Sequence, residues 1–346
     1  GGLMQLVAYG AQDIYLTGNP QITFFKVVYR RHTNFAMEAI EQTFNGVADF
    51  GNKVVCTIAR NGDLVGRMYL EIDIELAADK TLPKRFGHKL IKSAEVEVGG
   101  QRIDKHYGEW LNIWSQLSNS NEEVRKLNEM IDGDLRGDSD TVRKVYVPLQ
   151  FWFNRNPGLA LPLIALQYHE VKVAIEFSKT DMKDLPSGLK KLDNVCLFCD
   201  YIFLDTDERR RFAQVSHEYL IEQLQTTGRC SVGMGGKTQL SLEFNHPVKE
   251  LVWVCQKDGH KGTYNFAADD TKVTSPVGAD WASQETGAKE FVKSAKLQLN
   301  GHDRFRQRHG SYFRCLQTCQ HHTGGAAQHT SHVDHAELQL ENGYVY

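Results

Sequence analysis

The sequence has no excess of positive charge and no long apolar run. It has 40 Lys and Arg against 43 Asp and Glu, a formal net charge of -3, whereas proteins that hold nucleic acid usually carry a basic excess or a basic stripe. The longest apolar run, residues 159–166, is short and is interrupted by Pro162. No basic residue precedes Lys26, so the first residues do not resemble a secretory signal. We therefore expect neither direct nucleic-acid binding nor a membrane-spanning helix.

The cysteines also lack a recognisable framework. There are seven, an odd number, and the pair Cys196 and Cys199 has no second pair nearby with which to hold zinc. We expect reduced thiols, made in a cytosol-like compartment. No Asn-x-Ser/Thr sequon occurs in the sequence, so ordinary N-glycosylation is not signalled.

What the sequence does contain is a repeat. Residues 96–110 and 297–312 both run from an alternating strand through a Gly turn and a charged segment to a Gly-x-aromatic unit. A weaker echo relates residues 40–46 to residues 221–228. The offset of about 180 to 200 residues is too long for a solenoid and suits two copies of one domain. A length of 346 residues is also sufficient for two domains with separate cores.

Period-two alternation dominates both halves and predicts half-buried antiparallel strands. It is clearest in four segments: 67–76, 171–177, 239–244 and 337–340. A nearly continuous apolar strand is expected at 195–204. In the first segment, Glu71, Asp73 and Glu75 share one face. A general acid/base group could be imagined from these carboxylates, but a solvated sheet face explains them better.

Two short helices interrupt this pattern. Apolar residues at 110, 113, 114 and 117 have helical spacing, and Ser120 with Glu123 forms a capping box before a second helix. Residues 132–140 are rich in Asp and Gly and predict a surface loop. The polar segment from Lys257 to about Glu290 predicts a second, larger loop.

Many short strands with few helices indicate an all-β protein of two sandwiches or barrels. We predict two tandem eight-stranded jelly rolls with short helices inserted in loops. Immunoglobulin-like sandwiches would be shorter and would show a Cys, Trp, Cys spacing that is missing here.

Three motifs suggest more specific chemistry, but each has a simpler explanation. Residues 231–238 end like a phosphate loop, yet Ser231 stands where Gly is required and an alternating segment follows instead of a helix. Residues 132–143 are similar to a calcium loop, but Arg136 and Arg143 occupy ligand positions. Seven of the fourteen histidines lie between His302 and His335, without a recognised metal spacing. We therefore predict no catalytic residue, no metal site and no cofactor.

Four segments together resemble the major capsid proteins of nucleocytoplasmic large DNA viruses, such as those of chloroviruses, mimiviruses and iridoviruses. They are residues 2–26, 29–35, 153–170 and 297–304. The similarity covers nearly the whole chain. It implies a double jelly roll that forms a homotrimer of pseudo-hexagonal outline, with many trimers tiling an icosahedral shell over an internal membrane.

The resemblance also implies an organisation and a set of partners. We expect an inward-facing arm at 1–20, a first jelly roll at 21–204, a linker at 205–216 and a second roll at 217–346. Expected partners are further copies, neighbouring capsomers and minor capsid proteins, with the inner membrane nearby but not entered. Related capsid proteins can carry glycans at atypical asparagines. The expected location is the virion, after assembly in the host cytoplasm.

Two further expectations and two alternative functions complete the sequence-based hypothesis. The long insertions at 118–141 and 257–290 would point outward from the shell. Only 34 residues follow Tyr312, against about 95 after Trp110 in the first copy, so we expect the second roll to need strands beyond Tyr346. Two other functions stay open: a two-jelly-roll glycan hydrolase or amidase, which needs convergent acids, and a lectin, which needs a metal loop or an exposed aromatic platform.

Overall fold

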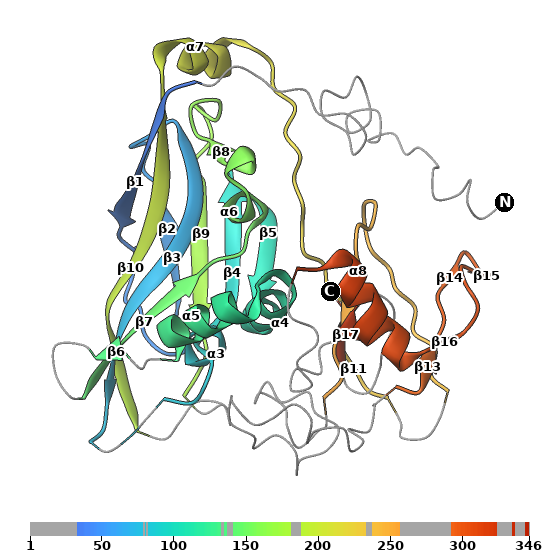
Figure 1. The fold of residues 1–346 in the computed structure, drawn as a ribbon. Helices are drawn as coiled ribbons and strands as arrows, with labels where there is room; N and C mark the ends of the chain where they lie inside the picture. Colours follow the sequence, from blue (N-terminus) through green and yellow to red (C-terminus); the bar gives the residue numbers. More distant parts are fainter. Residues whose placement is uncertain are drawn as a thin grey trace.

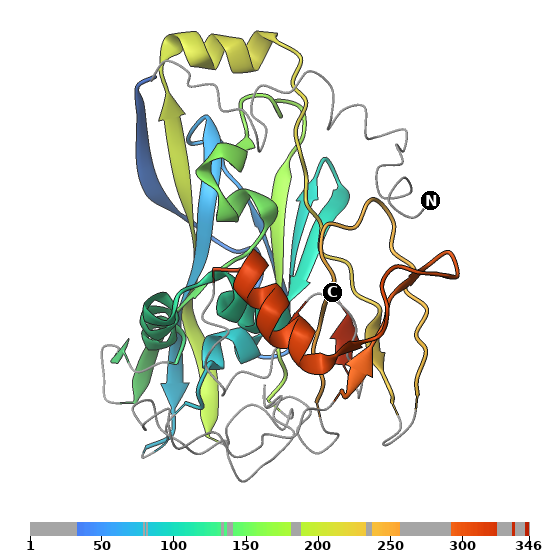
Figure 2. The same ribbon diagram turned by 45° about the vertical axis from the view of Figure 1, so that its right-hand side comes forward.

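A computed structural model describes ten stretches of the chain: residues 33–78, 80, 82–132, 135–136, 141–180, 188–232, 237–256, 292–323, 334–335 and 343–345. Two bodies of secondary structure lie side by side in it (Figures 1 and 2). We call residues 33–204 the first unit and residues 228–345 the second unit. Residues 215–227, which connect them after helix α7, are called the strap.

The first unit is a sandwich of two antiparallel sheets. One sheet has the order β1-β10-β3-β7-β6, with β8 also paired to β3, and the other has the order β2-β9-β4-β5. The strands are β1 (Phe35–Gln42), β2 (Lys53–Thr57), β3 (Leu64–Leu76), β4 (Ile91–Val98), β5 (Gln101–Tyr107), β6 (Leu135–Arg136), β7 (Val142–Pro148), β8 (Leu161–Pro162), β9 (Val171–Phe177) and β10 (Leu189–Leu204). Leaving out the two-residue β6 and β8, eight strands make two interlocked Greek keys, the topology of a jelly roll.

Alternation in the sequence explains how this sandwich is filled. On β3, Met68, Leu70, Ile72, Ile74 and Leu76 are all buried. They meet the inward residues of the other sheet in one continuous core. Because successive side chains on a strand point to opposite faces, a single alternating strand supplies one wall of the core.

Short helices close the ends and one side of the sandwich. They are α3 (Phe86–Leu90), α4 (Gly108–Ser118), α5 (Asn121–Ile131), α6 (Trp152–Arg155), the 3-10 turn η1 (Pro157–Leu159) and α7 (Thr206–Gln214). The predicted helices at 110–117 and after Ser120 are confirmed. The capping box is present, since Ser120 accepts from the backbone of Glu123 and the Glu123 carboxylate accepts in return. Strand β7 ends at Pro148, and α6 begins at Trp152.

The second unit has shorter strands in its described part. They are β11 (Gly228–Cys230), β12 (Val252–Trp253), β13 (Ser294–Ala295), β14 (Gln298–Leu299), β15 (His302–Asp303), β16 (Arg308–His309), β17 (Asp334–His335) and β18 (Gly343–Val345). They form a sheet of order β11-β18-β12-β17 and two small hairpins, β13-β16 and β14-β15. A π-helical turn, η5 (Tyr312–Gln317), runs into α8 (Thr318–His321).

One predicted strand of the second unit was wrong. Residues 239–244 form neither strand nor helix, although Leu240, Leu242 and Phe244 are half-buried and the residues between them are exposed. Leu242 and Phe244 pack against buried Trp253 and Phe313. The alternation correctly predicted which side chains turn inward, but a strand also requires a neighbouring backbone with which to pair.

Candidate functional site: the seam between the two units

An apolar seam joins the two units. From α4 of the first unit, Trp110, Ile113 and Leu117 project at helical spacing and are buried against Val252 and Val254 of the second unit. Tyr107, Trp114 and Leu224 pack around the edge of this cluster. Burial of side chains of this size contributes roughly 1.5–3 kcal/mol each, so the seam is a strong contact.

β12 and the residue after it contact both helices that follow the repeated hairpins, α4 in the first unit and η5 in the second. Val252 and Val254 face α4, whereas Trp253, between them, packs on Phe313 of η5 with ring centroids 5.7 Å apart. Alternation along an extended segment sends neighbouring side chains to opposite faces. The helix of the first repeat and the helix of the second therefore lie on the two sides of one short strand.

The strap adds polar contacts along the first unit. The Leu224 N–H donates to Asp104 Oδ1 at 3.0 Å, and Gln223 Nε2 donates to the Ile103 carbonyl at 2.5 Å. Nearer to α7 along the strap, the Tyr219 hydroxyl accepts a hydrogen bond from Trp152 Nε1 at 3.0 Å and donates one to a backbone carbonyl of η1. The strap is thereby fixed to β5 and α6, in the path that Figure 1 shows between α7 and the second unit.

Charged side chains bridge the seam as well. Arg155 of α6 lies 4.3 Å from the centre of the Trp114 ring and 3.8 Å from the Glu222 carboxylate of the strap. Arg229 of β11 contacts Glu109 of α4 at 2.9 Å. An arginine over an aromatic face with a carboxylate beside it is an arrangement that favours a fixed side chain.

Two buried titratable groups lie on β5 next to the seam. Burial raises the pKa of Asp104 to about 6, against the opposing effect of hydrogen bonds from the Leu224 and Lys105 backbone. Burial lowers the pKa of His106 to about 3, and the neighbouring Arg155 acts in the same direction. The His106 ring lies 4.4 Å from that of Phe151, and neither of its nitrogens has a hydrogen-bond partner among the described residues. Burial therefore shifts both groups toward their neutral forms: His106 is neutral at pH 7, whereas Asp104 keeps its proton only below about pH 6.

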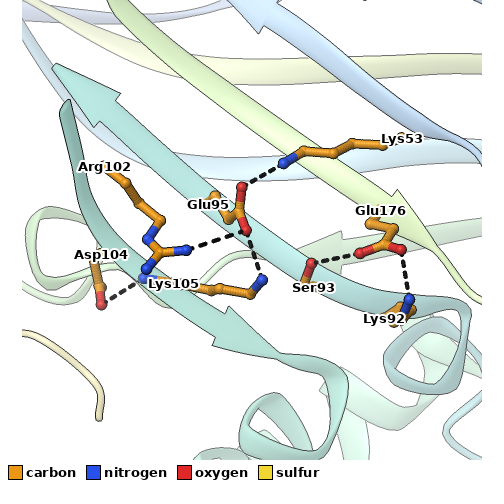
Figure 3. A network of polar contacts seen from close by, with 8 residues as sticks. All are labelled: Lys53, Lys92, Ser93, Glu95, Arg102, Asp104, Lys105 and Glu176. Atoms are coloured by element: carbon orange, nitrogen blue, oxygen red, sulfur yellow. Dashed lines mark hydrogen bonds and ion pairs between the residues drawn. The ribbon is translucent and has the colours of Figure 1, made fainter. Parts of the chain in front are cut away.

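The outer face of the β2-β9-β4-β5 sheet is held by ion pairs instead of apolar contacts (Figure 3). Glu95 lies between Lys53 at 2.5 Å and Lys105 at 2.6 Å, with Arg102 at 4.0 Å. Burial alone would raise the pKa of Glu95, but hydrogen bonds from Lys105 and Lys53 outweigh it and hold the pKa below its usual value. Glu176 is paired in the same way with Lys92 at 2.6 Å.

Comparison with known proteins identifies the family. A family model described as the major capsid protein N-terminus matches residues 23–205, and one described as large eukaryotic DNA virus major capsid protein matches residues 208–332. The major capsid protein of Pyramimonas orientalis virus is 54% identical over 330 residues, which cover 93% of this chain and 76% of that protein. The chain belongs to the major capsid proteins of large eukaryotic DNA viruses.

Other relatives agree in sequence and in fold. The major capsid protein of Paramecium bursaria Chlorella virus 1 is 44% identical, with 92% of this chain and 78% of that protein covered. A quasi-atomic model of the PBCV-1 virus capsid matches with a TM-score of 0.70 at 37% identity, covering 94% of this chain and 80% of that one. The fold is a double jelly roll with short helices, and both the family resemblance and the fold class expected from the sequence are confirmed.

The acidic residues singled out on β3 take part in ion pairs. Lys144 of β7 lies 2.5 Å from Glu71 and 3.2 Å from Asp73, and Asn194 donates to Asp73 at 2.9 Å. Glu75 pairs with Lys190 at 2.9 Å. The expectation of a solvated face holds for Glu71 and Glu75, which are partly exposed, but was wrong for Asp73, which the cross-strand partners bury.

Cys196 and Cys199, which are close in sequence, do not face each other. Cys199 is buried in the core, while Cys196 lies on the opposite face of β10 and donates to Glu41 at 3.0 Å. All seven cysteines are free thiols. Within the described part of the chain, no group of three or more His, Cys, Asp or Glu side chains is arranged to hold a metal ion. No helix there is long and apolar enough to cross a bilayer.

Several sequence-based expectations lie outside the described residues: the arm at 1–20, the loop at 257–290, the strand at 337–340, and His329 and His332 of the histidine-rich segment. The phosphate-loop-like and calcium-loop-like motifs are described only in part. The domain boundaries at 21–204, 205–216 and 217–346 stay predictions.

Sequence reasoning missed the seam and helix α7. A signal for α7 was present, because Asp205 stands three residues before Glu208, whose N–H it accepts at 2.9 Å. The seam had a weaker signal in the wide apolar surface of α4, where both Trp110 and Trp114 flank Ile113. The partner of that surface is some 140 residues away, and periodicity cannot supply it.

Proposed function

We propose that three copies of this chain assemble into a capsomer of pseudo-hexagonal outline, and that such trimers tile an icosahedral shell. The observation that carries the proposal is the seam, which joins two units that share a repeated hairpin and helix. Three chains with two similar units each present six similar lobes around a three-fold axis, and such an object fits a hexagonal lattice.

The role is structural, without a catalytic step. Relatives at 54% and 44% identity are named major capsid proteins. In the described residues, the acids that an enzyme would need to bring together are instead distributed in pairs with lysines along the sheet faces. The enzyme and lectin alternatives have no comparable support.

The partners follow from this role. They are further copies of the chain, neighbouring capsomers and minor capsid proteins, with the shell lying over an inner membrane that the chain does not enter. Assembly takes place in the host cytoplasm, glycans are carried at atypical asparagines, and the insertions at 118–141 and 257–290 point outward. Limited proteolysis of intact particles tests the loop assignment, since cleavage should fall in 257–290 before the first unit.

Sedimentation under native conditions tests the assembly. Three chains of 39.3 kDa give a particle of about 118 kDa (3 × 39.3). The expected result is a single species of that mass, because capsid subunits are joined through large permanent interfaces. A species that stays at 39.3 kDa up to high protein concentration would contradict the proposal.

A further inference from the structure

The outer face of the β1-β10-β3-β7 sheet carries an aromatic and apolar stripe. Tyr69 of β3 stacks on Phe198 of β10 with ring centroids 5.2 Å apart, and the Tyr146 ring of β7 meets Tyr69 edge-on at 6.2 Å. Met37 of β1 is on the same face and is 51% exposed. Rings of this kind are usually in protein cores or at interfaces.

This face contrasts with the outer face of the other sheet. There, Glu95 and Glu176 are saturated by lysines (Figure 3). On the β1 side, Glu41 and Asp200 have no cationic hydrogen-bond or ion-pair partner among the described residues. Burial raises the pKa of Asp200, with Arg67 opposing the effect only through space. Near β1 the face is thus more apolar and its carboxylates are less neutralised, whereas farther along the same face Glu71, Asp73 and Glu75 are paired with Lys144 and Lys190.

The opposite end of the molecule carries the complementary charge. The segment 292–309 of the second unit has five basic residues, Lys293, Lys296, Arg304, Arg306 and Arg308, against one acid, Asp303. Asp303 is already paired with Lys296 at 2.7 Å. Arg304 and Arg306 have no acidic partner in the described part of the chain. Figures 1 and 2 both place this hairpin at the far side of the molecule from β1.

The seam suggests how the β1-β10-β3-β7 face and the basic segment 292–309 of different copies could come into contact. Within one chain, the β5 and α4 side of the first unit packs against the second unit. In a closed ring of six alternating units, every first unit has a second unit on each flank, one from its own chain and one from a neighbour. Outside the seam, the first unit presents the outer faces of its two sheets, and of these the β1-β10-β3-β7 face is the more apolar.

We infer that, in the trimer, the outer face of the β1-β10-β3-β7 sheet is covered by the second unit of a neighbouring copy, with the basic segment 292–309 against Glu41 and Asp200. This inference rests on the proposed trimer and names the surfaces that close it. The contact is heterologous, since two different surfaces meet, and three such contacts close the ring. Opposite charges at its edges fix the register and favour association.

The first test is a substitution at an exposed residue on the edge strand of the face. Met37→Arg places a cation against the basic segment and should raise the dissociation constant of the trimer at least about tenfold, with the monomer still folded because Met37 is outside the core. Tyr168→Arg, at a loop residue 94% exposed, is the matched control and should leave the trimer intact. The measurement is sedimentation velocity, with thermal unfolding as the check on folding.

The second test uses the unmodified chain. Trimers assembled from heavy-isotope and light chains are treated with a carbodiimide, which joins lysines to carboxylates in direct contact. Links between Lys293 or Lys296 of one isotope and Glu41 or Asp200 of the other are expected. A Met37→Arg protein that stays trimeric, or lysine links confined to other surfaces, would overturn the inference while leaving the trimer proposal in place. A monomeric wild-type protein would instead reject the trimer itself.

Discussion

The two units share a hairpin and differ in what surrounds it. In the first unit, Gly99 and Gly100 join strands β4 and β5 of eight and seven residues; in the second, Asn300 and Gly301 join strands of two residues each. The four turn residues have φ of 60°, 81°, 50° and 81°. Positive φ at both central positions is the requirement of a tight two-residue hairpin of type I′, and both turns meet it.

The difference lies in the faces of the strands. β4 buries Ala94 and Val96 in the core of the sandwich, whereas Leu299 of β14 is 38% exposed. A ladder lengthens when its apolar face is covered, because the packing of side chains supplies most of the stabilisation of a sheet. Turn chemistry therefore determines where a hairpin forms, and burial determines how far its strands extend.

In the described part of the chain, the second unit depends on the contact with the first unit more than the first unit depends on it. The first unit closes a continuous core of its own. Among described residues, the second unit has a small cluster around Trp253 and Phe313, and two of its buried residues, Val252 and Val254, pack on α4 instead. Variants that act on one unit alone, or on the seam, should make this asymmetry measurable.

The largest effect is expected in the core of the first unit. Leu70→Ala removes a fully buried side chain from β3 and should lower the free energy of unfolding by about 3–5 kcal/mol, since a cavity is left behind. Leu299→Ala is the matched change on the exposed hairpin and should cost less than about 1 kcal/mol. Denaturant unfolding measures both values. Equal costs would mean that the two units are packed alike.

A smaller effect should follow from loosening the seam. Ile113→Ala creates a gap beneath Val252 and Val254 and should cost roughly 2–4 kcal/mol. Since the second unit uses this contact, it should then unfold in a separate transition before the first unit. Differential scanning calorimetry reports the number of transitions. Lys126→Ala on exposed α5 is the control, and a single cooperative transition for Ile113→Ala would contradict a dependent second unit.

Asp104 should make the strap contact sensitive to pH. Its folded pKa is about 6 and its ordinary value is 3.8, so between these values the folded chain holds a proton that the unfolded chain has released. The stabilisation is complete below pH 3.8 and is lost as the pH rises through 6. Relative to Asp104→Asn, which does not titrate, the wild type should lose roughly 2 kcal/mol of stability between pH 4 and 7.

Denaturant unfolding of both proteins across this pH range provides the check. Glu123→Gln, at an exposed carboxylate whose pKa is lowered by its capping hydrogen bonds from Ser120, is a useful comparison, because its stabilisation appears above the ordinary pKa instead of below it. Parallel pH profiles for wild type and Asp104→Asn would show that the Asp104 carboxyl does not titrate in this range.

Local signals in the sequence predicted most strands and helices of the first unit, because interactions between residues close in sequence determine these elements. Alternation identified β3 and β9, helical spacing identified α4, and Ser120 with Glu123 identified the start of α5. The family resemblance came from long motifs such as residues 153–170. The strands and helices named here depend on contacts between residues a few positions apart, or on an alternation that is visible within one strand.

What could not be predicted depends on distant partners. Residues 239–244 alternate like a strand but do not pair, and the burial of Asp73 follows from Lys144 and Asn194, which the sequence places far away. The seam joins α4 to Val252 and Val254 across about 140 residues. A single sequence contains both sides of such contacts without showing that they meet.

The smallest expected effect gives the most direct comparison of the two hairpins. Gly100 and Gly301 both have φ of 81°, and a Cβ built at either position would meet no atom within 4 Å. Alanine at each site is therefore penalised by backbone strain alone, which costs roughly 1 kcal/mol for a non-glycine residue in the left-handed region. Gly100→Ala and Gly301→Ala should lower the stability of their units by similar amounts in denaturant unfolding. At Gly99 a Cβ would come within 2.7 Å of His169 Nδ1, so Gly99→Ala should cost more than either. Unequal costs at Gly100 and Gly301 would show that the two turns differ in strain despite their equal φ, and that the hairpins are alike in sequence but not in energy.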